Sequence, residues 1–183
     1  MSTPLSRAQL LERLRAPGDD LMVTPLPAGD AIGAGTIDLR VGALILSAET
    51  ASLAPLDSDE PWRAARLFRE IHIRRDGHFF MQPGQFVLAS TFEYLVLPND
   101  LGGLIQSRST YGRMGIISVT AAYVAPRFHG CPTLELANVG EVPVRIRPYT
   151  ALCQLLLVPA DGTDLPPSRY QCATRPDFAR ARR

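Results

Sequence analysis

Three neighbouring stretches of this sequence combine residue types that could bind a charged ligand or move a proton. The first, residues 106–115, reads QSRSTYGRMG and places hydroxyl groups, two arginines and two glycines within ten residues. Arginine offers a rigid fork of N–H donors that suits phosphate oxygens, and glycine lets the backbone approach a ligand closely. The composition is that of a phosphate-binding loop, and equally that of a plain polar surface loop.

The second and third stretches run from residue 119 to residue 138. Residues 119–130, VTAAYVAPRFHG, predict a β-hairpin that could frame a flat ligand, with Gly130 beginning its second strand. Residues 131–138, CPTLELAN, place Glu135 in an otherwise apolar strand. Leu134 and Leu136 point to the opposite face, because side chains alternate along a strand. A carboxylate in that setting is either exposed to solvent or buried for a function.

The elements that must position these stretches are mostly short strands. Near the start of the chain, Ser6 and Gln9 fit the capping box of a helix. Beyond it the apolar pattern is that of strands, with alternation at 37–41 and 142–146 and apolar runs at 86–89, 94–97 and 152–158. The 16 prolines and 14 glycines are spread along the chain and mark many turns. The sequence therefore predicts a mainly β sandwich or barrel with a short N-terminal helix.

Composition excludes several classes of function. The 183 residues are 46% hydrophobic and 20% charged, which fits one globular domain over residues 1–183. A net charge of +1 argues against a protein that coats nucleic acid or an anionic membrane. All 19 basic residues are arginine, which excludes lysine-dependent P-loop, Schiff-base and pyridoxal-phosphate chemistry.

The cysteine and histidine spacing and the hydropathy pattern exclude further kinds of site and segment. The chain has three cysteines and three histidines, and neither set has the spacing of a disulfide framework or a zinc site. No apolar run approaches the ~20 residues of a membrane span. We therefore expect a cytoplasmic protein with no metal site and no membrane or nucleic-acid partner.

Two segments depart from the strand pattern. Residues 57–78 mix acidic residues, arginines and apolar residues. This mixture predicts a charged, solvated insertion with a short helix or hairpin, and a nucleic-acid patch is the less favoured interpretation. Residues 161–183 form a C-terminal tail that ends in an arginine-rich run.

Taken in order, these segments resemble the dCTP deaminases of the dCTP deaminase/dUTPase superfamily. The resemblance covers most of the chain and rests on the capped N-terminal helix and on residues 35–42 (GTIDLRVG), 82–89 (QPGQFVLA), 108–115 (RSTYGRMG), 130–135 (GCPTLE) and 169–171 (RYQ). It implies a distorted β-barrel or jelly-roll of the dUTPase-like type. It also implies a homotrimer with active sites between subunits, and a lid over residues 161–183.

The resemblance further implies hydrolytic deamination of dCTP, or a close analogue, to dUTP and ammonia. No catalytic metal is implied, and Mg²⁺ would arrive with the nucleotide triphosphate. Glu135 would be the general acid/base, Ser109 would hold the water or the ring substituent, and Arg113 would bind the triphosphate. The other implied substrate contacts are Arg108, Thr110, Tyr111 and Gly112 at the phosphates, Ala121, Thr133 and Leu134 at the base, Tyr123 and Ala125 in the hairpin, and Arg169, Tyr170 and Gln171 in the lid.

Three positions depart from the family pattern. Ala125 stands where the family has a hairpin aspartate that binds the deoxyribose 3′-hydroxyl and that dUTPases use to activate water. Tyr123 stands in place of an arginine and Ala173 in place of a glutamine. Ala125 argues against dUTPase activity, because alanine cannot activate water, and the three changes together would weaken binding of the standard ligand. Two alternatives stay open: a diverged paralogue that acts on another nucleotide or modified base, and a trimer that binds nucleotide without catalysis.

Overall fold

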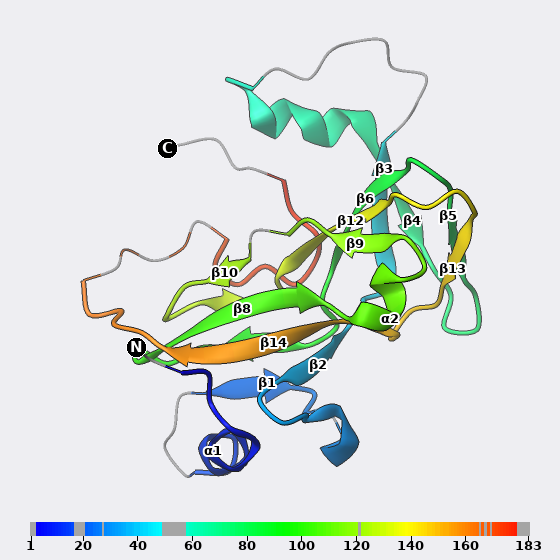
Figure 1. The fold of residues 1–183 in the computed structure, drawn as a ribbon. Helices are drawn as coiled ribbons and strands as arrows, with labels where there is room; N and C mark the ends of the chain where they lie inside the picture. The colour runs from blue at the N-terminus through cyan, green and yellow to red at the C-terminus, as the bar shows by residue number, and fades with distance from the viewer. Residues whose placement is uncertain are drawn as a thin grey trace.

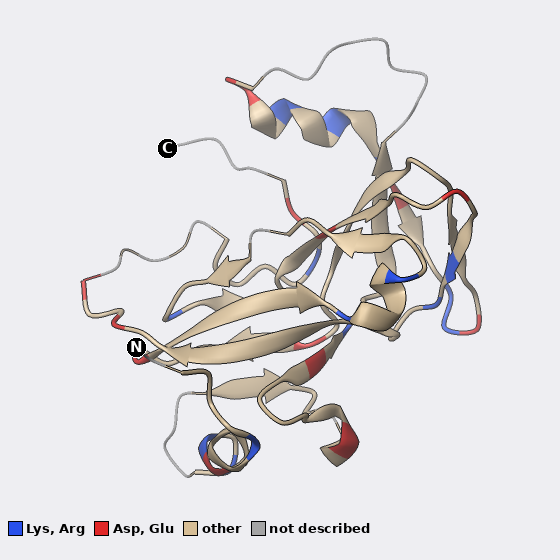
Figure 2. Ribbon diagram, in the orientation of Figure 1, with Lys and Arg blue, Asp and Glu red and all other residues tan. Residues whose placement is uncertain are grey.

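The chain folds into short strands that form four sheets around one apolar core (Figure 1). The computed structural model describes residues 3–16, 21–26, 28–48, 58–120, 122–164, 166, 168 and 170–178. Among these residues, no helix is both long and apolar enough to cross a membrane. Acidic and basic residues lie on several separate elements of the ribbon (Figure 2). The predicted mainly β fold is confirmed.

The helix α1 (Arg7–Arg13) begins where the capping box predicts. The Ser6 hydroxyl accepts from the Gln9 backbone N–H at 3.4 Å, and Gln9 Oε1 accepts from the Ser6 backbone N–H at 2.9 Å. Leu10 is fully buried, and Leu11 and Leu14 pack against the core. The helix therefore packs one apolar face against the sheets and leaves its other face in water.

A four-stranded antiparallel sheet carries the longest strand pairing. Its order is β10 (Tyr123–Val124), β8 (Leu101–Ser107), β14 (Ala151–Pro159) and β2 (Ile37–Arg40). In Figure 1, β8 and β14 run side by side along its middle. Leu155 and Leu157 of β14 are fully buried, as the apolar run at 152–158 predicts.

A five-stranded sheet carries Glu135. Its order is β4 (Phe68–His72), β3 (Leu44–Ala48), β6 (Phe86–Ser90), β12 (Thr133–Asn138) and β9 (Ile116–Ser118). In β12, Leu134, Leu136 and Asn138 are buried, whereas Thr133, Glu135 and Ala137 are only half-buried. The predicted alternation along this strand is therefore confirmed.

The described part of the chain also contains two smaller sheets and three short helical turns. Their bounds are β1 (Met22–Thr24), β7 (Tyr94–Val96) and β11 (His129–Gly130) in one sheet, β5 (Phe79–Met81) and β13 (Val144–Ile146) in the other, and η1 (Gly29–Ala31), η2 (Pro61–Leu67) and α2 (Ser109–Gly112) as the turns. The β13 strand starts at Val144, although the alternation predicts a start at Val142. Pro143 explains the difference, because proline has no N–H to donate to a strand ladder.

The hairpin predicted over residues 119–130 is wrong in its pairing. The strand β10 pairs with β8, and β11 pairs with β7, so the two strands join different sheets. A turn does connect them, closed by the Phe128 N–H donating to the Ala125 carbonyl at 3.2 Å. Each of these strands has only two residues, and each pairs with a longer strand, β10 with β8 and β11 with β7. The segment is thus a corner between two sheets, which sequence alternation cannot distinguish from a hairpin.

The described part of the 57–78 segment forms the helical turn η2 and the strand β4. The strand pairs with β3 over residues 44–48 and lies at the edge of the five-stranded sheet. Its side chains are half-buried or exposed. The segment therefore extends the sheet outward, and of its described side chains only that of Ile73, just after β4, is buried in the core.

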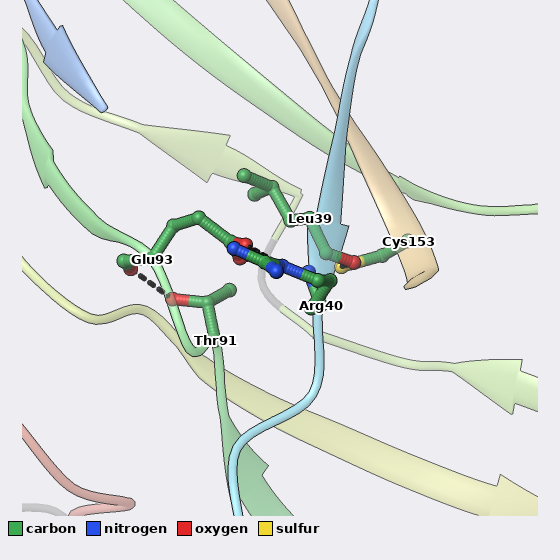
Figure 3. Close-up of polar contacts among 5 residues, drawn as sticks. All are labelled: Leu39, Arg40, Thr91, Glu93 and Cys153. Atoms are coloured by element: carbon green, nitrogen blue, oxygen red, sulfur yellow. Dashed lines mark hydrogen bonds and ion pairs between the residues drawn. The ribbon is translucent and has the colours of Figure 1, made fainter. Parts of the chain in front are cut away.

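One carboxylate is wholly enclosed by the fold. Glu93 has no exposed side-chain surface, and Figure 3 shows it against Arg40 of β2. The Arg40 Nε lies 2.5 Å from Glu93 Oε1, and the Arg40 backbone N–H donates to Glu93 Oε2 at 2.7 Å. The guanidinium also stacks over the Phe92 ring, 4.8 Å from its centroid. The buried charge thus has both an ionic partner and a backbone donor.

Candidate active site

A cavity of about 300 Å³ opens beside β10, β12 and the C-terminal segment. Its polar lining residues are Thr120, Tyr123, Thr133, Glu135, Ser168, Tyr170 and Asp177, and its other lining residues are Ile105, Val124, Ala125, Phe128, Cys131, Pro132 and Ala173. A pocket with an apolar wall and a few polar groups is the usual form of a small-molecule site.

Glu135 projects from the middle of β12 toward this cavity. Burial raises the pKa of its carboxyl above the ordinary 4.5. Desolvation disfavours the charged form of a carboxyl group, and a raised pKa brings the group closer to the range where a general acid/base works near neutral pH. The site therefore holds a carboxyl that can both release and take up a proton.

A chain of hydroxyl groups fixes the backbone at Glu135. The Glu135 N–H donates to Thr120 Oγ1 at 2.9 Å, and this oxygen lies 2.6 Å from Ser118 Oγ. The Ser118 N–H in turn donates to Ser107 Oγ at 2.7 Å. The Val119 N–H donates to the Glu135 carbonyl at 2.8 Å. These bonds connect β8, β9 and β12, so the position of Glu135 depends on three strands.

The C-terminal segment forms one wall of the cavity. The Gln171 side chain accepts from the His129 N–H and donates to the Arg127 carbonyl, both at 2.6 Å. Ala173 forms a parallel bridge with Gly130. The segment thus lies along the corner between β10 and β11.

The cavity brings together five of the predicted site residues, namely Glu135, Thr133, Tyr123, Ala125 and Tyr170. Gln171 does not line the cavity, but its hydrogen bonds to His129 and Arg127 hold it beside the cavity. The Leu134 side chain is fully buried in the core, which leaves only its backbone for a ligand. Ala121 and Arg169 lie outside the described residues.

The predicted phosphate segment, residues 108–113, does not line this cavity. Ser109, Thr110, Gly112 and Arg113 lie exposed in and just after α2. Tyr111 packs against the core. Within one chain the structure therefore separates the residues predicted for the phosphates from those predicted for the base.

Arg108 has a partner that the sequence does not reveal. Its guanidinium lies 3.1 Å from Asp38 Oδ2 of β2 and 3.4 Å from the Ala151 carbonyl. Burial raises the pKa of Asp38, and the nearby Arg108 charge partly offsets that rise. This ion pair anchors the start of α2 to the four-stranded sheet.

Sequence reasoning missed Thr120 and Asp177 as cavity residues. Thr120 lies in a quoted stretch, but its bond to Glu135 crosses 15 positions of sequence. Asp177 lies 42 positions after Glu135, in a tail whose composition gives no sign of a site. Within the described residues, no group of three His, Cys, Asp or Glu side chains could hold a metal ion.

Comparison with known proteins agrees with the fold and with the predicted resemblance. A family model described as dCTP deaminase-like matches residues 4–159. A protein of Methanothermobacter thermautotrophicus named "dCTP deaminase, dUMP-forming" is 37% identical over 153 residues, covering 79% of this chain and 77% of its own. A protein of the same name from Coprothermobacter proteolyticus is 40% identical over 137 residues, covering 74% of this chain and 72% of its own.

A solved structure shares the fold at low identity. The 2′-deoxycytidine 5′-triphosphate deaminase of Agrobacterium tumefaciens superposes with a TM-score of 0.67 at 19% identity, over 87% of this chain. This chain spans about half of that longer chain, 48% of it. Because the family model covers most of the sequence and relatives above 30% identity align along most of their length, the chain belongs to the dCTP deaminase-like family.

Proposed function

We propose that this protein hydrolyses the amino group of dCTP, supplied as its Mg²⁺ complex, to give dUTP and ammonia. The observation that carries the proposal is Glu135, a carboxyl with a raised pKa on the wall of a ligand-sized cavity. Membership of a hydrolase family favours catalysis over nucleotide binding alone. The names of the relatives favour dCTP over another nucleotide.

Glu135 would act twice in this reaction. Its carboxylate takes a proton from water as the hydroxide oxygen bonds to C4 of the cytosine ring, and it returns that proton to N3. It then carries the proton of the new hydroxyl group to the amino nitrogen. The C4–N bond breaks and ammonia leaves, while the ring keeps a C4 carbonyl and an N3–H. The carboxylate is restored at the end of the cycle.

The other lining residues would orient the base and limit water. Thr120 holds the backbone of Glu135, and Thr133 presents a hydroxyl two residues away on the same face of β12. Ile105, Phe128 and Pro132 supply an apolar wall. Apolar surroundings strengthen the electrostatic interactions of the reacting groups, because little water remains to screen them.

A second copy of the chain would supply the phosphate-binding residues. The lining residues that the structure describes include no arginine, whereas a triphosphate requires cationic or N–H donors. Ser109 and Arg113 are exposed on α2, which suits a role at the cavity of a neighbouring copy. This arrangement supports sites shared between copies of the chain, as in the homotrimer that the resemblance implies.

Two products are possible after deamination. Release of dUTP is favoured by Ala125, since a methyl group on the cavity wall cannot activate a second water against the triphosphate. Both relatives are named dUMP-forming, which makes dUMP with diphosphate the second candidate. Phosphorus NMR of the reaction mixture separates the two, because only dUMP formation releases diphosphate.

Mixing two inactive variants tests both the chemistry and the shared site. Glu135→Gln and Arg113→Ala should each fail to release ammonia from dCTP. After the two are unfolded and refolded together, mixed trimers would contain some sites with both native residues, and activity should return to a measurable fraction of wild type. Failure to regain activity, with trimers shown by light scattering, would contradict the shared site. Absence of ammonia from the wild type would contradict the proposed function.

A further inference from the structure

Residues 170–178 meet the cavity at three points, Tyr170, Ala173 and Asp177. The Cys172 N–H donates to the His129 carbonyl at 2.8 Å, and the Cys131 N–H donates to the Ala173 carbonyl at 2.7 Å. Gly130, with a φ of 147°, permits this approach, because a Cβ there would lie 3.1 Å from the Ala173 oxygen and 3.2 Å from the Phe128 ring. A side chain at position 130 would therefore crowd this part of the segment.

The segment next reaches Thr133, two residues before Glu135 on β12. The Asp177 N–H donates to Thr133 Oγ1 at 3.1 Å, and Asp177 lines the cavity. Thr133 and Glu135 lie on one face of β12, two residues apart, which corresponds to about 7 Å along a strand. The cavity is thus bordered by two carboxylates from different parts of the chain.

Two contacts to the 57–78 segment flank Asp177. Arg175 forms an ion pair with Glu70 of β4. The Phe178 ring meets Phe68, also of β4, edge to face with centroids 4.8 Å apart and an angle of 65°. Both contacts reach the same edge strand from opposite sides of Asp177. An exposed ion pair adds little to the free energy of unfolding. We therefore assign the Arg175–Glu70 pair a positioning role, in which it holds the turn at Asp177 in place.

We propose that Asp177 is a substrate-contacting residue that accepts a hydrogen bond from a donor group of the nucleotide, and that β4 positions it. The inference rests on the proposed function and deepens it. A carboxylate oxygen accepts hydrogen bonds, so a ligand group that binds to it must be an N–H or O–H group. In a deoxycytidine nucleotide these donors are the exocyclic amine and the sugar 3′-hydroxyl. Asp177 therefore helps to select ligands that carry such a donor.

Titration of Asp177→Asn with three nucleotides tests the contact. The ligands are dCTP, dideoxy-CTP, which lacks the 3′-hydroxyl, and dUTP, which lacks the amine. Calorimetry in the Glu135→Gln background prevents turnover during the measurement. We expect about a tenfold or greater loss of dCTP affinity. If the 3′-hydroxyl is the donor, Asp177→Asn should not change the affinity for dideoxy-CTP. If the amine is the donor, the substitution should not change the affinity for dUTP.

Asp164→Asn is the matched control, because Asp164 is an exposed carboxylate of the same tail that does not line the cavity. It should leave all three affinities unchanged. An equal loss for all three ligands, or no loss for any, would overturn the role of Asp177. If the wild type releases ammonia from dCTP, that result leaves the proposed function standing.

Charge exchange tests the positioning role of β4. Glu70→Arg should raise the KM for dCTP several-fold with little change in kcat, and adding Arg175→Glu should restore it. Asp76→Asn, which breaks the exposed Arg74–Asp76 pair of the same segment, should leave the KM unchanged. An unchanged KM in Glu70→Arg would overturn this part of the proposal. So would a KM that stays raised in the double variant while its melting temperature equals that of the wild type.

Discussion

Glu93 and Glu135 are both carboxylates in apolar surroundings, but the fold treats them in opposite ways. Glu93 has no exposed surface and accepts from both the side chain and the backbone of Arg40 (Figure 3). Glu135 is half-buried at the cavity, and burial raises its pKa. Among the described residues, no side-chain partner offsets this burial. Glu93 is built as a structural ion, whereas Glu135 keeps its carboxyl available to a ligand.

The difference follows from what surrounds each group. A charge enclosed in the core is tolerated only with donors that replace its hydration. A carboxyl at a cavity keeps some water, and its charged form is disfavoured without being forbidden. Mutation of Glu135 should therefore lower turnover, whereas mutation of Glu93 should lower stability.

The largest expected effect is on turnover at Glu135. Glu135→Gln keeps the shape of the side chain but cannot transfer a proton, so kcat for ammonia release from dCTP should fall by ~10²–10⁴. The melting temperature should not fall, because the native carboxyl has no ionic partner among the described residues to lose. Full activity in this variant would sink the acid/base assignment.

The second effect is on stability at Glu93. Glu93→Gln leaves the Arg40 guanidinium without its counter-charge, and breaking a fully buried pair costs about 3–5 kcal/mol. Arg40 is 33% exposed, so we expect a loss of about 2–3 kcal/mol in the free energy of unfolding, measured with urea. Asp76→Asn, at an exposed pair, should change it by less than about 0.5 kcal/mol. A loss at Glu93 no larger than that at Asp76 would contradict the structural role of the buried Glu93–Arg40 pair.

A third carboxylate placed on the cavity wall should behave like Glu135, as a group available to ligand. Ala125 lines the cavity, and Ala125→Asp would offer an acceptor to a sugar hydroxyl. We expect dCTP affinity to rise about tenfold, which corresponds to ~1.4 kcal/mol. Titration of both forms with dCTP at the same magnesium and salt concentrations measures the change. Unchanged affinity would mean that position 125 does not face the ligand.

The smallest effect is a pH dependence of stability that comes from Glu135. Its pKa is higher in the folded protein than the ordinary 4.5, so the folded state binds its proton more tightly. The stabilising contribution is complete below about 4.5 and is lost as the pH rises through the folded pKa. The difference in unfolding free energy between wild type and Glu135→Gln should therefore fall over that window. A difference that rises there would reverse the assigned sign.

Local patterns predicted the elements that depend on neighbours in sequence. The Ser6–Gln9 capping box, the alternation of β2 and β12, and the buried run of β14 all follow from spacing alone. Each depends on contacts within a few residues, or on one face of a strand being apolar. The corner between β10 and β11 was mistaken for a hairpin, because alternation says nothing about which sheet a strand joins.

The candidate site likewise has features that follow from neighbours in sequence and features that depend on contacts between distant residues. Residue order alone places Glu135 in an apolar strand after an arginine- and hydroxyl-rich segment, and the order of these motifs indicates the family. The packing of the sheets is needed to show that Thr120, Asp177 and Glu135 border one cavity and that no residue of α2 lines it. The physical reason is distance along the chain, since contacts between residues tens of positions apart are set by how the sheets pack.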